Sequence, residues 1–275
     1  MNKKVILITG ASSGIGYETA KDLIVQGYTV YASARRVERM SKLEDLGGYV
    51  LNMDVTKEAD VQKVVETVIS NEGKIDVLWN NAGFGLFGSI EETSLDDARY
   101  QFEVNLFGLA SITQKVTPHM RKAGEGLIIN TSSMCGRMYA SLGAWYHATK
   151  HALEGWSDCL RVEVKDFGIR VVILEPGAIQ TEFAEVMVAP MIERSGQGAY
   201  KKLADALKKM IEKELDNVSG SPSSVISRTV QKIIKAKRTS TRYLVGKYAK
   251  PMVYIREIAG DRVFDKIINL MLNQY

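Results

Sequence analysis

The chain has 275 residues, of which 45% are hydrophobic and 25% are charged, as in a soluble globular protein. A formal net charge of +4 is too small to require a nucleic-acid partner. The two cysteines, Cys135 and Cys159, match no metal-binding or redox spacing. We therefore expect reduced thiols in a cytoplasmic protein and no bound metal. Because no run of about 18 apolar residues occurs, we expect no membrane-spanning helix.

Apolar runs alternate with amphipathic stretches along most of the chain. Strands are expected at residues 4–9, 29–34, 49–52, 77–80, 127–131, 170–175 and 242–245. Helices are expected at residues 14–26, 61–72, 94–121, 148–167 and 223–236. Strands that are apolar throughout and joined by helices indicate a parallel sheet covered on both faces. The sequence thus predicts an α/β fold: a doubly wound, Rossmann-type parallel sheet of about seven strands, in a single domain over residues 1–275.

Three stretches depart from this alternation. Residues 182–222 form an insertion, for which we expect short helices and a role as a substrate lid. Residues 251–275 should form a C-terminal helical extension packed on the domain, with a subunit contact or a membrane-surface helix as alternatives. Residues 228–256 contain no acidic side chain. The ordinary interpretation is a solvated face, and the alternative is contact with anionic lipid or an acidic acyl-carrier protein.

A glycine-rich loop, with the pattern G-x-x-x-G-x-G, follows the first strand directly. Gly10 can turn tightly, Gly14 lets the backbone approach a phosphate, and Gly16 allows close packing of helix on strand. The helix that follows offers free N–H groups and a positive dipole end to a pyrophosphate. The alternative is a plain tight turn with no ligand.

The end of the second strand distinguishes between cofactors. An NAD enzyme places a carboxylate here, whereas an NADP enzyme places arginine near the additional phosphate. The strand ends in Arg35 and Arg36, with no acid before Glu38. The hydroxyls of Ser12 and Ser13 can add further donors. We therefore predict NADP(H) in preference to NAD(H); the alternative is that both arginines are ordinary surface charges.

Ser133 follows the fifth strand, and Tyr146 and Lys150 lie four residues apart on one helix face. A phenol has a pKa of about 10, and an adjacent ammonium is expected to lower it. Tyr146 can then give a proton to a carbonyl or take one from an alcohol, while Ser133 hydrogen-bonds the substrate oxygen. His147 points to another helix face, so we expect it to be structural. Cys135 is expected to pack inertly.

Taken in this order, the motifs resemble the short-chain dehydrogenase/reductase family over residues 4–181, particularly its hydroxysteroid or retinol dehydrogenase-like and ketoacyl reductase-like branches. The resemblance implies an oxidoreductase that interconverts a ketone or aldehyde and its alcohol. It implies four catalytic residues, namely Asn105, Ser133, Tyr146 and Lys150, with Asn105 holding a water in a proton relay to the lysine. Together with the two arginines, the implied cofactor-binding residues are Gly10, Ser12, Ser13, Gly14, Ile15, Gly16, Asp54, Val55, Asn81, Ala82, Gly83, Tyr146, Lys150, Pro176, Gly177, Ile179 and Thr181.

Apolar residues follow the catalytic strands and fill the insertion, although each could equally belong to the core. They predict a hydrophobic carbonyl or alcohol substrate, which is steroid-, retinoid- or acyl-like. By resemblance, the long helices at 94–121 and 148–167 would build a homodimer or homotetramer. A catalytically silent NADP(H)-sensing regulatory protein on the same fold is the alternative function. We disfavour it because the tyrosine and the lysine are both present.

Overall fold

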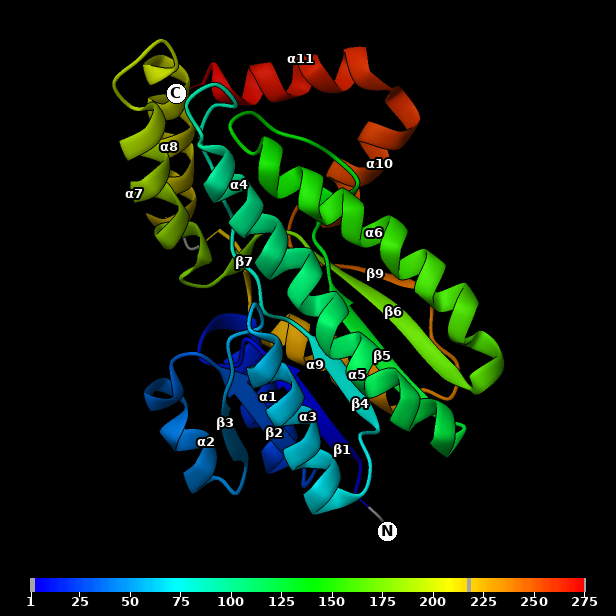
Figure 1. The fold of residues 1–275 in the computed structure, drawn as a ribbon. Coiled ribbons are helices and arrows are strands. Elements are labelled where there is room, and N and C mark those ends of the chain that lie inside the picture. Colours follow the sequence, from blue (N-terminus) through cyan, green and yellow to red (C-terminus); the bar gives the residue numbers. More distant parts are fainter. Residues whose placement is uncertain (1–2, 217–218, 275) are drawn as a thin grey trace.

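The computed structural model describes residues 3–216 and 219–274 (Figure 1). In this part of the chain, seven parallel strands form one sheet in the order β3-β2-β1-β4-β5-β6-β9. They are β1 (Val5–Thr9), β2 (Thr29–Ala34), β3 (Tyr49–Asn52), β4 (Val77–Asn80), β5 (Gly126–Thr131), β6 (Ile169–Pro176) and β9 (Arg242–Val245). The doubly wound parallel sheet predicted from the sequence is confirmed.

Helices cover both faces of this sheet. One face carries α1 (Gly14–Val25) and α9 (Ser224–Lys235), and the other carries α3 (Glu58–Glu72), α5 (Gly108–Ala123) and α6 (Ala144–Val164). Successive strand residues point to opposite cores, so Ile6 packs with α1 and α9 while Leu7 packs with α3 and α5. Burial on both sides explains why the strands are apolar at nearly every position.

Shorter elements connect these layers. A 3₁₀ turn (Val37–Met40) and α2 (Ser41–Asp45) join β2 to β3, and two more 3₁₀ turns lie at Met134–Gly136 and Lys165–Phe167. The single helix predicted at 94–121 is in fact α4 (Leu95–Phe102) and α5, joined by a π-helical turn at Glu103–Phe107. The helix predicted at 148–167 begins earlier, at Ala144, where the N–H of His147 already bonds the carbonyl of Gly143.

The segment at 182–222 is more regular than expected. It contains α7 (Phe183–Ser195) and α8 (Lys201–Asp216), of 13 and 16 residues, instead of short helices. A short parallel pairing of β7 (Ile179–Gln180) with β8 (Ser221–Pro222) joins the two ends of the segment. The two ends of the segment therefore lie side by side where β7 pairs with β8. Its helices share a buried apolar cluster with Leu142 and Leu272.

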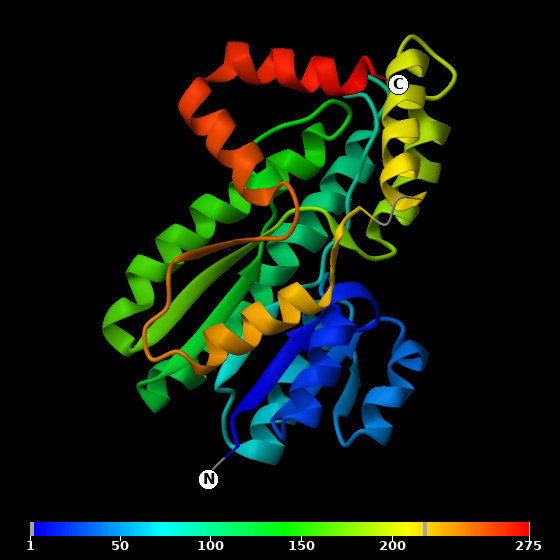
Figure 2. The same cartoon turned by 180° about the vertical axis from the view of Figure 1, so that it is seen from behind.

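The C-terminal extension consists of α10 (Ala249–Ala259) and α11 (Asp261–Leu272), which meet at Gly260. Figure 2 shows α11, in red, running along the end of the molecule toward α8. Phe264 is fully buried against the loop that follows β5. The outer sides of both helices expose apolar residues, among them Ile258 and Leu270. None of the described helices has the length and apolar character needed to cross a membrane.

The strand order reverses between β1 and β4. From β1 the chain proceeds through β2 and β3 on one side, and it continues from β4 through β9 on the other. In open parallel sheets a crevice lies at such a reversal, outside the carboxyl ends of the strands. Because all seven strands of this sheet are parallel, the motifs that follow β1, β4, β5 and β6 share this edge.

Candidate active site

The glycine-rich loop after β1 is fixed to the end of β4. Thr9 Oγ1 accepts hydrogen bonds from the backbone N–H groups of Asn81, at 3.0 Å, and Ala82, at 2.9 Å. The Asn81 side chain donates to the carbonyl of Gly10 at 3.0 Å. A Cβ on Gly10 would lie 2.7 Å from Ala82 Cα, and a Cβ on Gly16 would overlap the Gly10 carbonyl oxygen. The backbones approach so closely that only glycine fits at both positions.

The start of α1 offers unpaired donors to the crevice. The N-cap residue, Ser13, makes no side-chain hydrogen bond to the helix. The N–H groups of the first turn lack partners within the helix and lie at its positive dipole end, an arrangement that suits phosphate. Ser12, Ser13, Gly14 and Ile15 are half-buried here. A Cβ on Gly14 would lie 3.5 Å from the Thr181 methyl group, so the segment after β6 passes directly over this loop.

Both arginines that follow β2 are exposed at the edge of the crevice. Arg35 donates to the Tyr100 hydroxyl at 3.0 Å. Arg36 has no ion-pair partner among the described residues. Arg39 instead pairs with Glu182 at 3.0 Å, which links this region to the start of α7. The guanidinium of Arg36 is thus available to an anionic ligand.

Asp54 and Val55 follow β3 at the same edge. Asp54 Oδ1 accepts hydrogen bonds from the backbone N–H of Thr56, at 3.0 Å, and from its hydroxyl, at 2.8 Å. Burial alone would raise the pKa of Asp54, but these hydrogen bonds and the charge of Arg35 outweigh it and lower the pKa below its ordinary value. Gly108 packs against Val55 with no room for a side chain. Asp54 therefore presents a fixed carboxylate.

Four side chains from the loop after β5, from α6 and from the π-helical turn form one buried group. Asn105, Ser133, Tyr146 and Lys150 are each at most 8% exposed. Lys150 Nζ lies 5.8 Å from the centroid of the Tyr146 ring. A Cβ on Gly83 would lie 3.1 Å from Asn105 Oδ1 and 3.8 Å from Lys150 Nζ. The structure therefore brings together the four residues for which catalytic roles are expected.

Backbone groups hold the serine and the lysine in place. Lys150 Nζ donates to the carbonyl of Thr131 at 2.8 Å, which fixes the ammonium at the end of β5. Ser133 Oγ accepts from the N–H of Cys135 at 3.1 Å and donates to the carbonyl of Pro176 at 3.4 Å. The segments that follow β5 and end β6 thus meet at Ser133.

Asn105 lies in the middle of the π-helical turn. Its Oδ1 accepts from the N–H of Phe84 at 3.1 Å, and its Nδ2 donates to the Phe84 carbonyl at 3.0 Å and to Thr149 Oγ1 at 3.3 Å. Single π-helical turns within α-helices occur frequently at functional sites. Here the turn fixes Asn105 between the segment after β4 and the helix that carries Lys150.

The pKa of Tyr146 is raised above its ordinary value. From the sequence, we expect the ammonium of Lys150 to lower this pKa. Burial is the main cause, the charge of Cys135 adds to it, and a hydrogen bond with Ser133 acts in the opposite direction. Burial also lowers the pKa of Lys150 to about 8. The expected lowering of the Tyr146 pKa is therefore wrong, because desolvation disfavours both the phenolate of Tyr146 and the ammonium of Lys150.

The turn after β6 is anchored to the segment after β9. The N–H of Gly177 donates to the carbonyl of Val245 at 2.8 Å, and a Cβ on Gly177 would overlap the carbonyl of Lys247. Pro176 is buried, while Ile179 and Thr181 are half-buried beside the crevice. This anchoring directs the chain from β6 back over the glycine-rich loop.

Apolar side chains flank the phenol. The ring centroids of Phe87 and Phe183 each lie 5.8 Å from that of Tyr146. Leu142 adopts a φ of +60°, which is uncommon for a residue other than glycine, and its carbonyl accepts from the N–H of Gly88 at 2.8 Å. These residues form an apolar wall beside the tyrosine.

Comparison with known proteins establishes the family of this chain. Residues 4–191 match the family model described as short chain dehydrogenase. The chain belongs to the short-chain dehydrogenase family. The resemblance drawn from the motifs is thereby confirmed.

Individual relatives cover most of this short-chain dehydrogenase. A relative from Bacteroides thetaiotaomicron, named 3-ketodihydrosphingosine reductase, is 38% identical over 247 residues, which cover 90% of this chain and 89% of the relative. The crystal structure of a short-chain dehydrogenase from Streptomyces avermitilis has 30% identity and a TM-score of 0.78, with coverages of 94% and 93%. A serine dehydrogenase in its closed form with NADP⁺ has 27% identity and a TM-score of 0.77, with coverages of 88% and 94%. The chain is an oxidoreductase that acts on CH–OH and C=O groups.

In this short-chain dehydrogenase, His147 supports the loop that follows β5. It is buried, and its Nδ1 lies 3.1 Å from the carbonyl oxygen of Cys135 and 2.9 Å from that of Met138. Burial disfavours the thiolate of Cys135, but the neighbouring His147 and Ser133 outweigh it and lower the pKa of the thiol. Cys135 is therefore more acidic than a simple packing residue.

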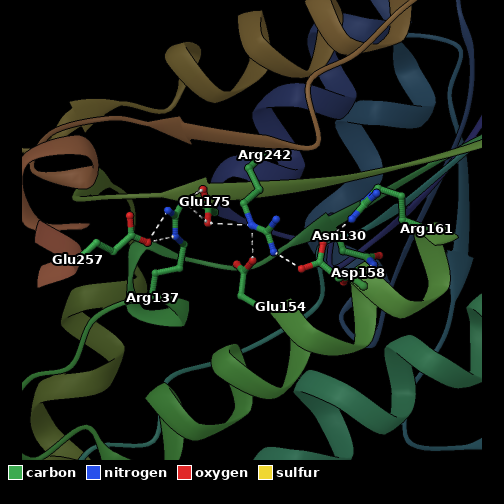
Figure 3. A network of polar contacts seen from close by, with 9 residues as sticks. Asn130, Arg137, Glu154, Asp158, Arg161, Glu175, Arg242 and Glu257 are labelled. Atoms are coloured by element: carbon green, nitrogen blue, oxygen red, sulfur yellow. Dashed lines mark hydrogen bonds and ion pairs between the residues drawn. The ribbon is translucent and has the colours of Figure 1, made fainter. Parts of the chain in front are cut away.

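A group of charged residues that the sequence does not predict lies beside the site. Figure 3 shows Arg137, Glu154, Glu175 and Arg242 in one network of hydrogen bonds and ion pairs. The one signal in the sequence is a carboxylate, Glu175, that directly follows the apolar run at residues 171–174 of β6. Among the residues that the structure describes, no group of three or more His, Cys, Asp or Glu side chains is placed to hold a metal ion.

Proposed function

We propose that this short-chain dehydrogenase uses NADP(H) to interconvert a hydrophobic ketone or aldehyde and its alcohol, with Tyr146 as the general acid and base. The observation that carries the proposal is the convergence of Asn105, Ser133, Tyr146 and Lys150 at the crevice edge of the sheet. A chain that only sensed the cofactor would have no need of a buried phenol and a buried ammonium side by side, each of which is costly to ionise.

The geometry and the family resemblance together support a role for each of the four residues. When bound, the nicotinamide supplies or accepts the hydride. Ser133 hydrogen-bonds the substrate oxygen, and Tyr146 gives it a proton as negative charge develops there. A phenol with a raised pKa keeps its proton until that oxygen becomes an alkoxide, which is far more basic than a phenolate. Lys150 then stabilises the phenolate that remains, and Asn105 holds a water in the relay that restores the proton.

The residues at the crevice suit a phosphorylated dinucleotide. Their close backbone contacts, free helix N–H groups and exposed arginines match a pyrophosphate and an additional ribose phosphate. The solved serine dehydrogenase contains NADP⁺, which supports the same cofactor here. We assign the cofactor to Gly10, Ser12, Ser13, Gly14, Ile15, Gly16, Arg35, Arg36, Asp54, Val55, Asn81, Ala82, Gly83, Tyr146, Lys150, Pro176, Gly177, Ile179 and Thr181.

A long-chain ketone fits the apolar surroundings of the phenol. Phe87 and Phe183 flank Tyr146, and the helices α7 and α8 add an apolar cluster around Met191. The relative named 3-ketodihydrosphingosine reductase supports a substrate of this kind. We further propose that residues 182–222 close over the ligand as a lid and that residues 1–275 form one domain.

We also propose that the enzyme is a cytoplasmic homodimer or homotetramer. The outer sides of α4, α6 and the π-helical turn expose large apolar residues, namely Leu95, Phe107 and Val162. A contact between copies through these helices would bury them.

The central experiment measures NADPH oxidation with 3-ketodihydrosphingosine, a steroid ketone, retinal and a ketoacyl thioester. We expect turnover with at least one of them, and a loss of about 1,000-fold or more in Tyr146→Phe with unchanged NADPH affinity. Binding of NADPH without turnover of any carbonyl in this panel would favour the silent sensor instead. Wild-type rates in Tyr146→Phe would refute the role of the tyrosine.

A further inference from the structure

A fully buried carboxylate, Glu175, lies at the junction of the catalytic segments. It has no exposed surface, and two guanidinium groups face it: Arg137 Nη1 at 3.4 Å and Arg242 Nε at 3.7 Å (Figure 3). Glu175 directly precedes Pro176, whose carbonyl accepts the hydrogen bond from Ser133. The carboxylate thus lies one residue away from the backbone group that contacts the catalytic serine.

Arg137 links the catalytic loop to two other elements. It follows Ser133 by four residues, and its side chain reaches Glu175 at the end of β6. Its Nε also donates to Glu257 of α10 at 2.8 Å. The guanidinium of Arg137 therefore joins the loop that carries Ser133 both to the sheet and to the C-terminal extension.

Arg242 makes the equivalent link to the catalytic helix. From β9 it donates to Glu154 at 3.0 Å and to Asp158 at 2.6 Å, both on α6. Glu154 follows Lys150 by one helical turn. A Cβ on Gly136 would lie 3.0 Å from Glu154, so the catalytic loop packs its backbone directly on this carboxylate.

We propose that Arg137 and Arg242, joined through Glu175, are positioning residues that hold Ser133 and Lys150 at fixed separation, which makes β9 and α10 part of the active-site scaffold. The inference rests on the proposed function and deepens it. Displacements of about 1 Å in an active site can cost two orders of magnitude in rate, so a link of this kind has a measurable effect on turnover.

Positioning explains this network better than stability does. Burying charges costs desolvation energy, and apolar replacements of buried ion pairs are often neutral or stabilising. The planar guanidinium forks, however, fix direction as well as distance. Each arginine joins two separate elements, and both meet at Glu175. The network therefore fixes the relative positions of the elements that the two arginines join.

The same charges act on Lys150. Cys135 and Glu154 are the groups whose charges favour its ammonium form. Glu154 faces Arg242 from β9 and Glu175 from β6, while Arg137 faces Glu175 from the catalytic loop. Because carbonyl reduction needs a charged Lys150, turnover should fall as the pH rises through the pKa of this lysine. Loss of the Glu154 charge should lower the pKa of Lys150, so the fall in turnover on the alkaline side of the pH profile should move to lower pH.

The test compares Arg137→Gln, Arg137→Lys, Glu257→Gln and Glu154→Gln with a control, Lys74→Met. Lys74 also forms an ion pair, at 2.9 Å with Asp76, but at the opposite end of the sheet. Glu257 is 41% exposed at its side chain, so its replacement should leave the fold intact. The assays are kcat and KM with the best carbonyl of the panel, the Kd for NADPH by fluorescence, and melting temperature.

We expect kcat to fall about 10-fold in Arg137→Gln, less in Glu257→Gln, and to recover in part in Arg137→Lys, with the Kd for NADPH within about twofold of wild type. In Glu154→Gln the alkaline limb of kcat should move down by about half a pH unit. Lys74→Met should match wild type in kcat. Unchanged kcat in both Arg137→Gln and Glu257→Gln, or a pH limb in Glu154→Gln that superimposes on wild type, would overturn the proposal. A wild-type protein that turns over no carbonyl would instead refute the proposed function.

Discussion

The ring of Phe183 lies 5.8 Å from the ring of Tyr146, centroid to centroid, although Phe183 is the first residue of α7 and Tyr146 lies near the start of α6. The segment at 182–222 thus contributes an aromatic side chain to the wall beside the phenol of Tyr146. If Tyr146 acts as proposed, a substrate bound beside it would contact α7 through Phe183.

Replacing Phe183 by alanine should weaken binding of an apolar substrate. Burial of an aromatic side chain is worth about 1.5–3 kcal/mol, so we expect KM for 3-ketodihydrosphingosine to rise about 10-fold or more. The Kd for NADPH should change little. Val186→Ala, on the exposed side of the same helix, is the control and should behave as wild type. An unchanged KM in Phe183→Ala would show that the substrate lies elsewhere.

Removing the two arginines after β2 should change cofactor preference. Each charge-assisted hydrogen bond to a phosphate is worth about 1.5–3 kcal/mol. The double variant Arg35→Ala, Arg36→Ala should therefore raise the Kd for NADPH about 100-fold and leave that for NADH almost unchanged. Lys42→Ala removes a nearby exposed cation and serves as the control. Wild-type protein that binds NADH as tightly as NADPH contradicts the assignment.

Gly16→Ala should abolish dinucleotide binding. Its Cβ would overlap the carbonyl of Gly10, a backbone atom that cannot move without opening the loop. Overpacking of this kind typically costs about 1–3 kcal/mol of stability. Gly155→Ala is a matched control, because this helical glycine in α6 has open space around it and alanine should stabilise the helix by about 0.5–1 kcal/mol. Calorimetry with NADPH and urea unfolding measure both effects.

Glu175 should make folding stability depend on pH. Burial and the charge of Glu154 raise the pKa of Glu175 from 4.5 to about 7. Between these values the unfolded chain has lost the proton while the folded chain keeps it. Stability therefore falls as the pH rises through this window. We expect wild type to lose on the order of 2 kcal/mol relative to Glu175→Gln, as measured by urea unfolding at both ends of the window.

The control for this measurement is Glu58→Gln, because the side chain of Glu58 is 82% exposed. Its stability should depend on pH as that of wild type does. Parallel stability curves for wild type and Glu175→Gln would show that the carboxyl group of Glu175 ionises normally in the folded chain.

The sequence was sufficient for the fold because its signals are local and repeated. The bounds of β2, β3, β4 and β9 agree with the expectation residue by residue, since apolar runs ending in glycine or polar residues mark strands clearly. Ser133, Tyr146 and Lys150 were found from their spacing after the fifth strand and along one helix, whereas Asn105 was implied only by the resemblance to the family. Asn105, Ser133, Tyr146 and Lys150 accordingly lie together.

The remaining features depend on tertiary contacts that no local pattern contains. The raised pKa of Tyr146 comes from burial, which depends on what packs over the ring. The network at Glu175 joins residues up to 120 positions apart. The motif already placed Tyr146 at the opening of a helix, and α6 begins two residues earlier, at Ala144. Aromatic residues such as Trp145 are weak helix formers, and tertiary packing overrides that weakness.

The π-helical turn at Glu103–Phe107 has a geometric consequence for the two helices that it joins. Successive residues of an α-helix are rotated by about 100°, so one inserted residue resets the angular phase of everything that follows. The buried residues of α4 and those of α5 therefore do not follow one continuous α-helical repeat. Deleting a single residue here should restore one continuous α-helix, so that the buried faces of α4 and α5 would follow the same helical repeat. A length change of one residue would then matter more than many substitutions along the same helices.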